Sequence, residues 1–358
     1  MLGRTLDVLL LMGGISAEHP VSLRSAASVL RALDSRGHRV CTVGITRSGS
    51  WLLGDFTELL AKSEASIVEL AENYGRRVAL AFDGSRARLV SLAGDGLDES
   101  CSFPDLVFPL VHGPGGEDGT LQGLLSLSRV PFVGAGTTAS ALAMDKLAMK
   151  ALCRDAGVSQ VDFFDASALD ATVVAEILES GFGYPCFVKP ANLGSSVGIS
   201  RVEEPARLGD ALVSARRWDR RVIVEQAVDA REIEVALLGN DHPSFSPPGE
   251  VVSAGGFYDF DEKYRGSRAE LLAPTELPSA TVERLHQLCS EVWALVGCRG
   301  MARADFFIDK GSGELLFNEL NTIPGFTAIS MYPKLWAAAG LDMAGLVDRL
   351  LELALESG

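Results

Sequence analysis

Short apolar runs alternate with longer mixed segments along the first part of the chain. Residues 7–45 (DVLLLMGGISAEHPVSLRSAASVLRALDSRGHRVCTVGI) follow the order strand, glycine turn, helix, glycine stop and strand. Residues 105–134 repeat this order, with a glycine-rich loop after the apolar run. Such strand–helix–strand units imply parallel strands that are covered by helices. The pattern therefore predicts an α/β domain with a parallel sheet.

The middle of the chain carries shorter apolar runs, from PCFVKP at residue 185 to EVVSA at residue 250. Their connections are mostly too short for helical crossovers, which is typical of antiparallel strands. Helical patterns flank them at residues 137–157, 279–297 and 342–356. The whole chain is therefore expected to be α/β, with α+β parts, in three domains. Their expected bounds are 1–133 (βαβ, parallel), 134–229 and 230–358 (both mixed or antiparallel).

Composition narrows the range of partners. The 358 residues carry a net charge of -15, which argues against nucleic acid or an anionic membrane surface as partner. No apolar run is long enough to span a bilayer, and the apolar N-terminus is too short for a signal peptide. The six cysteines are scattered and form no C-x-x-C pair. Reduced thiols in a cytoplasm are therefore favoured over a disulfide framework or a zinc site.

Two carboxylates and an amide are predicted to converge on a hairpin near the C-terminus. Because side chains alternate along a strand, Arg303 and Asp305 share one face, and Phe317, Glu319 and Asn321 share a face of the next strand. A five-residue loop would set Asp305 opposite Glu319 and Arg303 opposite Asn321. Facing carboxylates repel, and a hard cation such as Mg²⁺ or Mn²⁺ would relieve this. The alternative is a salt bridge from Arg303 to one acid on a solvent-facing sheet.

A second group of signals suggests phosphate binding. The segment CFVKPANLGSSVGIS places Lys189 at a strand end, before glycines and serines whose N–H and hydroxyl groups could cradle phosphates. Such a segment is more often only a turn, and the P-loop and Rossmann fingerprints are absent. Lys146 lies on a predicted helix, where a lysine is ordinarily solvated. A linker then precedes Glu232 and Glu234, which share a strand face. Together these features would build an ATP site without a P-loop.

Eight segments, in order, resemble those of one family. They are GGISAEHPVSL, HGPGGEDGTLQG, ASALAMDK, VKPANLGSSVGIS, EQAVDAREIEVALLG, FYDFDEKY, RADFFID and NELNTIPGFTAIS, and they span roughly residues 7–340. The chain resembles the D-alanine–D-alanine ligases of the ATP-grasp superfamily. This resemblance implies a three-domain ATP-grasp fold, in which the middle and C-terminal domains clasp ATP.

The resemblance also implies a nucleotide site and a metal site. Three lysines would contact the phosphates, a linker would hold adenine, and Glu232 would bind the ribose. Relatives often carry an aromatic residue at the position of Ala227, so here the base would lose a stacking surface. The implied nucleotide-binding residues are Lys146, Lys189, Ser195, Ser196, Glu225, Gln226, Ala227, Val228, Glu232 and Lys263. The implied ligands of two Mg²⁺ or Mn²⁺ ions are Asp305, Glu319 and Asn321.

The implied reaction joins two D-alanines through a D-alanyl phosphate. Phosphoryl transfer creates a good leaving group, and the amine of the second D-alanine then attacks. Arg303 and the backbone N–H of Gly325 match the oxyanion donors of the family. Glu18 would bind the ammonium of the first D-alanine. Without the resemblance, Glu18 would be an acid that the helix dipole favours.

Further substrate contacts follow from the same resemblance. Ser195 and Tyr264 match residues that hydrogen-bond with Glu18 and close a flap, and Ser330 matches a contact to the second carboxylate. His112 resembles a residue that lines the first-substrate pocket, although a lone histidine after a buried strand is more often structural. The charged loop around Tyr264 would exclude water from the acyl phosphate; otherwise it is an exposed loop. Ligases that make D-alanyl-D-lactate lack this tyrosine, so a dipeptide product is expected.

The resemblance implies a cytoplasmic homodimer that supplies peptidoglycan precursors. One alternative is another ATP-grasp carboxylate–amine ligase, acting on a different D-amino acid pair in specialised metabolism or antibiotic self-resistance. It would keep the metal residues and alter Glu18, Tyr264 or Ser330, which are all present. A second alternative is a non-catalytic nucleotide-binding regulator. It could lose Arg303 or a metal carboxylate, and both are retained.

Overall fold

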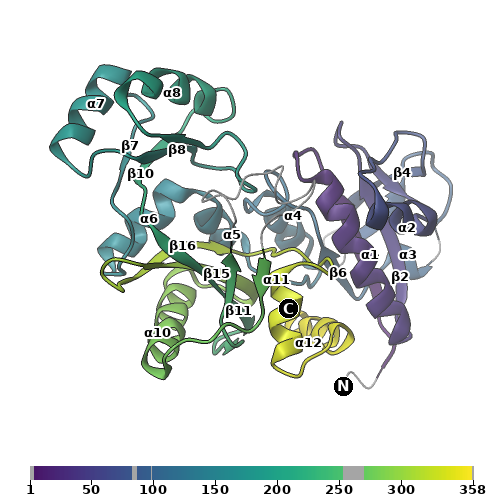
Figure 1. Cartoon of the computed structure of the whole chain (residues 1–358). Helices are drawn as coiled ribbons and strands as arrows, with labels where there is room; N and C mark the ends of the chain where they lie inside the picture. Colours follow the sequence, from purple (N-terminus) through teal and green to yellow (C-terminus); the bar gives the residue numbers. More distant parts are fainter. Residues whose placement is uncertain (1–3, 83–86, 98, 253–269, 357–358) are drawn as a thin grey trace.

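The fold is taken from a computed structural model, which describes residues 4–82, 87–97, 99–252 and 270–356. Three sheets follow one another along the chain, each with helices packed on it (Figure 1). The predicted α/β class is therefore confirmed. Among the described residues, no helix has both the length and the apolar character that crossing a membrane requires.

The first sheet has the strand order β5-β4-β3-β2-β1-β6. Strands β2, β1 and β6 run parallel, as the strand–helix–strand pattern predicts. The other half is antiparallel, because the five residues between β2 and β3 are too few for a helical crossover. The elements are β1 (Asp7–Gly13), α1 (His19–Ser35), β2 (Arg39–Ile45), β3 (Trp51–Leu53), α2 (Thr57–Ala65), β4 (Arg76–Phe82), β5 (Ala87–Ser91), α3 (Glu99–Ser102), β6 (Leu106–Pro109) and α4 (Thr120–Ser128).

The second sheet is antiparallel, as predicted, with the order β7-β10-β8-β9. Two helices pack on it around a core that includes Val174, Leu212 and Val224. The elements are β7 (Phe163–Asp165), α7 (Ala171–Ser180), β8 (Cys186–Pro190), β9 (Ser200–Val202), η1 (Pro205–Arg207), α8 (Leu208–Arg216) and β10 (Val222–Gln226).

The third sheet is also antiparallel, in the order β14-β13-β11-β15-β16, with β12 beside β11. Helices α5 and α6 precede the second sheet in the sequence, yet Ala139 and Met149 pack in the core of the third sheet with Val235 and Trp293. The elements are α5 (Thr137–Met144), α6 (Lys146–Asp155), β11 (Ala230–Gly239), β12 (Ser244–Phe245), β13 (Gly249–Val252), β14 (Glu270–Leu272), α10 (Ser279–Val296), β15 (Gly300–Asp309) and β16 (Leu315–Asn321).

The single helix predicted for residues 137–157 is wrong, because the structure has two helices that are separated at Asp145. Asp145 is extended (φ -85°, ψ 99°), and its side chain accepts a hydrogen bond from the Ala148 N–H at 3.0 Å. A carboxylate in this position pairs an amide that the start of a helix leaves open. The Lys146 N–H donates to the Ala191 carbonyl at 3.0 Å, so α6 begins beside the loop after β8.

The carboxylate hairpin has the predicted pairing at the end where Asp305 lies opposite Glu319. The register shifts between Asp305 and Phe306, and Phe306 therefore pairs with Phe317. The ring of Phe317 is fully buried, 5.7 Å from that of Phe306. The prediction that Phe317 shares a face with Glu319 is wrong, because an irregularity of one residue reverses the alternation of side chains.

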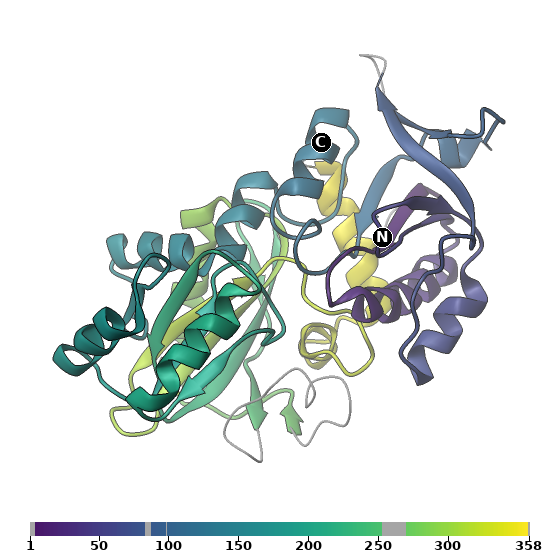
Figure 2. The same ribbon diagram turned by 90° about the horizontal axis from the view of Figure 1, so that it is seen from above.

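Two C-terminal helices, α11 (Met331–Ala338) and α12 (Met343–Glu356), return to the N-terminal part of the chain. Leu346 and Leu350 of α12 pack in one core with Leu10 and Leu33. In Figure 2 the yellow C-terminal segment lies between the N-terminal unit and the remaining sheets. The end of the chain thus ties the third sheet to the first.

One disulfide joins Cys41 of β2 to Cys101 of α3, with their Cα atoms 5.5 Å apart. The cysteines Cys153, Cys186, Cys289 and Cys298 are free and buried. The expectation of reduced thiols is wrong for the first pair. Sixty residues separate these two cysteines in the sequence, and the packing of α3 beside β2 brings them together.

Candidate active site

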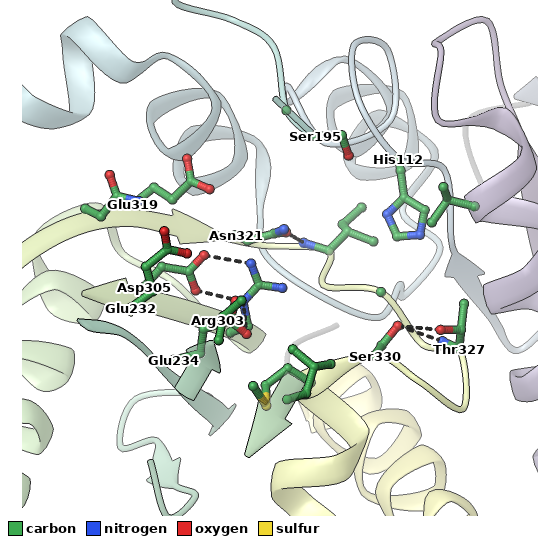
Figure 3. A pocket seen from close by; sticks show the side chains of 18 of the residues that line it. His112, Ser195, Glu232, Glu234, Arg303, Asp305, Glu319, Asn321, Thr327 and Ser330 are labelled. Atoms are coloured by element: carbon green, nitrogen blue, oxygen red, sulfur yellow. Dashed lines mark hydrogen bonds and ion pairs between the residues drawn. The ribbon is translucent and has the colours of Figure 1, made fainter. Parts of the chain in front are cut away.

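The hairpin, the start of α1 and the glycine-rich loop after β8 meet at a cavity of about 430 Å³. Figure 3 shows the acids and Arg303 of the third sheet on one side, with Ser195 and His112 on the other. The residues with predicted roles that line this cavity are Glu18, His112, Ser195, Glu232, Arg303, Asp305, Glu319, Asn321, Gly325 and Ser330.

Two carboxylates hold Arg303, one from its own strand β15 and one from the neighbouring strand β11. Its Nε and Nη2 donate to the two oxygens of Asp305 at 2.7 and 2.6 Å, and its Nε lies 3.0 Å from Glu234 Oε2. Burial alone would lower the pKa of Arg303, but the charges of Asp305 and Glu234 raise it well above its ordinary value. The salt bridge considered as the alternative for the hairpin is therefore present. Its side chains are 18% and 13% exposed and line the cavity, so it does not lie on a solvent-facing sheet.

Oxygen atoms of β16 complete this side of the cavity. Asn321 lies opposite Arg303, and its Oδ1 accepts a hydrogen bond from the Ile323 N–H at 3.1 Å. Glu319 is 37% exposed, and its Oε2 lies 3.7 Å from Lys146 Nζ.

These donors fit a divalent ion that shares its coordination with phosphates. Carboxylate and amide oxygens suit Mg²⁺ or Mn²⁺. Within the described ranges, no group of three or more Asp, Glu, His or Cys side chains could hold a metal by itself. An ion between Asp305 and Glu319 would therefore complete its coordination with ligands from outside the protein.

Two glycine-containing loops close around Glu18. The Ser195 hydroxyl donates to Glu18 Oε1, which is the hydrogen bond that the family resemblance implies. A Cβ atom at Gly113 would lie 2.8 Å from Glu18 Oε2, and one at Gly194 would lie 3.4 Å from the same oxygen. Ser195 adopts a left-handed conformation (φ 51°), which costs energy for a residue other than glycine. The loop is thus shaped around this carboxylate.

Two further buried titratable groups, His112 and Glu117, line the cavity together with Glu18. His112 Nε2 is 3.2 Å from Ser25 Oγ, and burial lowers the pKa of His112 to about 4, so its ring is neutral near pH 7. The N–H of Gly113 donates to Glu117 at 2.8 Å. Burial and the charge of Glu18 raise the pKa of Glu117 well above its ordinary value. Glu117 therefore accepts a proton more readily than an ordinary glutamate.

The turn between β16 and α11 brings Gly325 against Ser330. A Cβ atom at Gly325 would lie 2.8 Å from Ser330 Oγ, so a larger residue here would displace the Ser330 hydroxyl. Ser330 Oγ accepts from the Thr327 N–H at 3.1 Å and lies 2.7 Å from Thr327 Oγ1 (Figure 3). This turn is therefore held by its own hydrogen bonds at the edge of the cavity.

Two of the lysines with predicted phosphate contacts, Lys146 and Lys189, lie within the described residues. Lys146 is 12% exposed and donates to the Leu193 carbonyl at 2.7 Å, so it is not an ordinary solvated lysine. It lines a smaller adjoining pocket together with Glu319. Lys189 Nζ lies 2.5 Å from Glu225 Oε2, and the Glu225 side chain is only 2% exposed. The Glu225 carboxylate thus serves as a counter-ion within the protein.

Of the other predicted nucleotide residues, those that the structure describes are not among the residues that line the cavity. The N–H groups of Gln226 and Ala227 donate to the carbonyls of Asp162 and Pro185, at 2.9 and 3.2 Å, so these two amides do not face a base. Val228 lies in the same linker, and Ser196 follows Ser195 with a φ of 59°. Lys263 and Tyr264 lie outside the described residues.

Glu234, Lys150 and Glu117 interact with residues of the site and have no predicted role. Glu234 follows from strand alternation, because it shares a face with Glu232. Lys150 lies one helical turn after Lys146 and therefore points to the same side of α6. Glu117 carries no such signal, because its burial depends on the packing of the glycine-rich loop around it.

Comparisons with known proteins find relatives that match nearly the whole chain. Family models described as D-ala D-ala ligase N-terminus and C-terminus match residues 7–135 and 152–352. The D-alanine--D-alanine ligase of Thermoanaerobacter sp. (strain X514) is 42% identical, over 98% of this chain and 96% of the relative. The solved D-alanine-D-alanine ligase of Coxiella burnetii is 36% identical with a TM-score of 0.84, over 99% of this chain and 95% of that one. The VanG D-Ala:D-Ser ligase of Enterococcus faecalis is 32% identical with a TM-score of 0.85, over 98% and 100%.

Proposed function

The chain belongs to the D-alanine–D-alanine ligase family, and from this premise we propose that the 430 Å³ cavity is where the family's reaction takes place. The chain is an ATP-dependent ligase that joins two D-alanines, and its product serves peptidoglycan precursor synthesis. One observation carries the placement: the Glu18–Ser195 pair and the Arg303–Asp305–Glu319 group line the same cavity.

The first step makes a D-alanyl phosphate, because a free carboxylate has no adequate leaving group. Lys146, Lys189 and Lys263 would hold the phosphates of ATP. Asp305, Glu319 and Asn321 would bind two Mg²⁺ or Mn²⁺ ions, which neutralise charge on the transferred phosphoryl group when they are bound. The position of Lys146, 3.7 Å from Glu319, supports a phosphate site beside the metal site.

The second step joins the two amino acids. Glu18 would bind the ammonium of the first D-alanine and so present its carboxyl carbon to the acceptor. The acceptor amine attacks this carbon, and the oxyanion that forms would receive hydrogen bonds from Arg303 and the Gly325 N–H. Arg303 stays protonated because its two carboxylate partners raise its pKa. Collapse of the oxyanion then expels phosphate and leaves the peptide bond.

The remaining predicted contacts would set specificity. Ser330 lies at the edge of the cavity, where it would bind the carboxylate of the acceptor, and His112 would line the first-substrate pocket. Ser195 and Tyr264 would close the site over the acyl phosphate and orient an amine in preference to a hydroxyl. Neither the described residues nor the comparisons favour a different amino acid pair.

We also propose a domain division and an assembly. The separate sheets support three units, and the family supports a homodimer in the cytoplasm that has no nucleic acid or membrane partner. The units are 1–133, 134–229 and 230–358, with α5 and α6 packing on the sheet of the third.

A direct test is ADP release with ATP, Mg²⁺ and D-alanine, measured beside L-alanine, D-serine and D-lactate. We expect turnover with D-alanine and formation of a dipeptide. Turnover with an unrelated acid and none with D-alanine would refute the substrate assignment.

A further inference from the structure

Two lysines share one buried carboxylate beside the proposed phosphate site. Lys189 Nζ lies 2.5 Å from Glu225 Oε2, and Lys150 Nζ lies 3.5 Å from Glu225 Oε1. Lys189 comes from β8 and is 12% exposed, whereas Lys150 comes from α6 and is 2% exposed. Lys189 can therefore reach a ligand, and Lys150 cannot.

The buried carboxylate is ionised in this arrangement. Burial alone would raise the pKa of Glu225, but the charges of Lys150 and Lys189 lower it to about 2. Lys146 acts in the same direction more weakly. However, its Nζ donates to the Leu193 carbonyl at 2.7 Å, so Lys146 is not a substitute for either partner.

A buried carboxylate that loses its only cation is strongly destabilised, whereas one that keeps a second cation is not. A nucleotide phosphate that attracts Lys189 competes directly with Glu225 for the same ammonium. Lys150 stays behind in that exchange, because it is buried with its Nζ 5.8 Å from the centre of the Phe163 ring. The Glu225–Lys150 pair that remains is neutral.

We propose that Lys150 is a positioning residue for nucleotide binding, which keeps Glu225 paired when Lys189 turns toward a phosphate. The inference rests on the proposed phosphate contact of Lys189. Lys150 then acts on nucleotide affinity through Glu225 and Lys189, without touching the nucleotide itself.

The test is the Kd of ADP with Mg²⁺, measured by calorimetry on the full chain. Lys150→Met removes the second cation, so Glu225 retains Lys189, and we expect the Kd to rise about tenfold or more. In the Glu225→Gln background no carboxylate is left at this position to hold Lys189. In that background the same Lys150→Met change should alter the Kd by less than about twofold, because the effects of substitutions at coupled residues are not additive. A wild-type Kd for Lys150→Met, or an equal loss in both backgrounds, would overturn the inference.

The binding stoichiometry distinguishes this positioning role from a structural one, and a control variant distinguishes it from a general effect of charge. A merely structural role of Lys150 lowers the fraction of binding-competent protein, seen as reduced stoichiometry, and leaves the Kd unchanged. Lys310→Met removes the same charge from an exposed pair with Asp229 and should bind ADP like the wild type.

Lys189→Met is measured alongside, because it tests the contact on which the inference rests. If it binds ADP normally, the phosphate contact of Lys189 fails and this inference fails with it. If only Lys150→Met binds normally, the proposed contact stands and the inference alone is overturned.

Discussion

Ser195 donates a hydrogen bond to Glu18 across 177 residues of sequence, and this contact joins the glycine-rich loop of the second sheet to the start of α1. The two residues come from units with separate cores, since the elements of the first and second sheets share no hydrophobic cluster among the described residues. The hydrogen bond therefore closes the cavity from the side opposite the carboxylate hairpin. Its strength should govern how well the first substrate is held.

Ser195→Ala tests this contact. The variant removes one hydrogen bond to a charged group, worth about 1.5–3 kcal/mol. We therefore expect kcat/KM for D-alanine to fall roughly tenfold to hundredfold, with little change in melting temperature. Steady-state kinetics and thermal unfolding measure both. Ser180→Ala, on an exposed helix end, is the matched control; equal kinetics for the two variants would contradict the role of Ser195.

Glu319→Gln tests the proposed metal site. The carboxylate is partly exposed and lies 3.7 Å from Lys146, so its contribution to stability is small. Its proposed contribution to phosphoryl transfer is large, and we expect the rate to fall by about a hundredfold or more at saturating Mg²⁺. Glu314→Gln changes a carboxylate at the turn of the same hairpin and should remain active. Full activity of Glu319→Gln would refute the metal role.

The hairpin also shows how far sequence reasoning reaches. Alternation along β15 and β16 predicts Asp305 opposite Glu319, because that rule depends only on local geometry. It misplaces Phe317, since the shift of register beyond Asp305 reflects how two phenylalanines fill the core. The break between the helices at Asp145 does have a local signal, since an aspartate is a common N-cap residue. The apolar pattern continues across this position and therefore predicts a single helix.

Features that depend on distant packing are harder to predict. Cys41 and Cys101 pair only because α3 lies beside β2. The carboxylate of Glu225 faces two lysines from different elements, and no spacing in the sequence brings Lys150 and Lys189 together. Family resemblance readily identifies the residues that contact substrate. It identifies less readily the residues that hold those side chains in place.

Tyr264→Phe tests the choice of acceptor. Loss of the hydroxyl removes a group expected to organise an attacking amine, so the use of D-lactate relative to D-alanine should increase. Product ratios from a mixture of the two acceptors measure this directly. Tyr74→Phe makes the same change on an exposed residue and should leave the ratio at its wild-type value. If Tyr264→Phe also leaves it there, the specificity assignment is wrong.

The burial of His112 predicts a dependence of stability on pH. Burial lowers its pKa from 6.5 to about 4, so the unfolded chain binds a proton in this interval more readily than the folded protein. The folded state therefore loses stability as the pH falls through 6.5, and this loss reaches its limit below the folded pKa near 4. At pH 5 the loss from this one group amounts to about 2 kcal/mol.

His112→Gln has no such proton to bind, so its unfolding free energy should fall by less than that of the wild type between pH 7 and pH 5. Urea unfolding at the two pH values measures the difference. His242→Gln removes an exposed histidine and should follow the wild type. Identical pH dependence of His112→Gln and the wild type would show that His112 takes up its proton without opposing the fold.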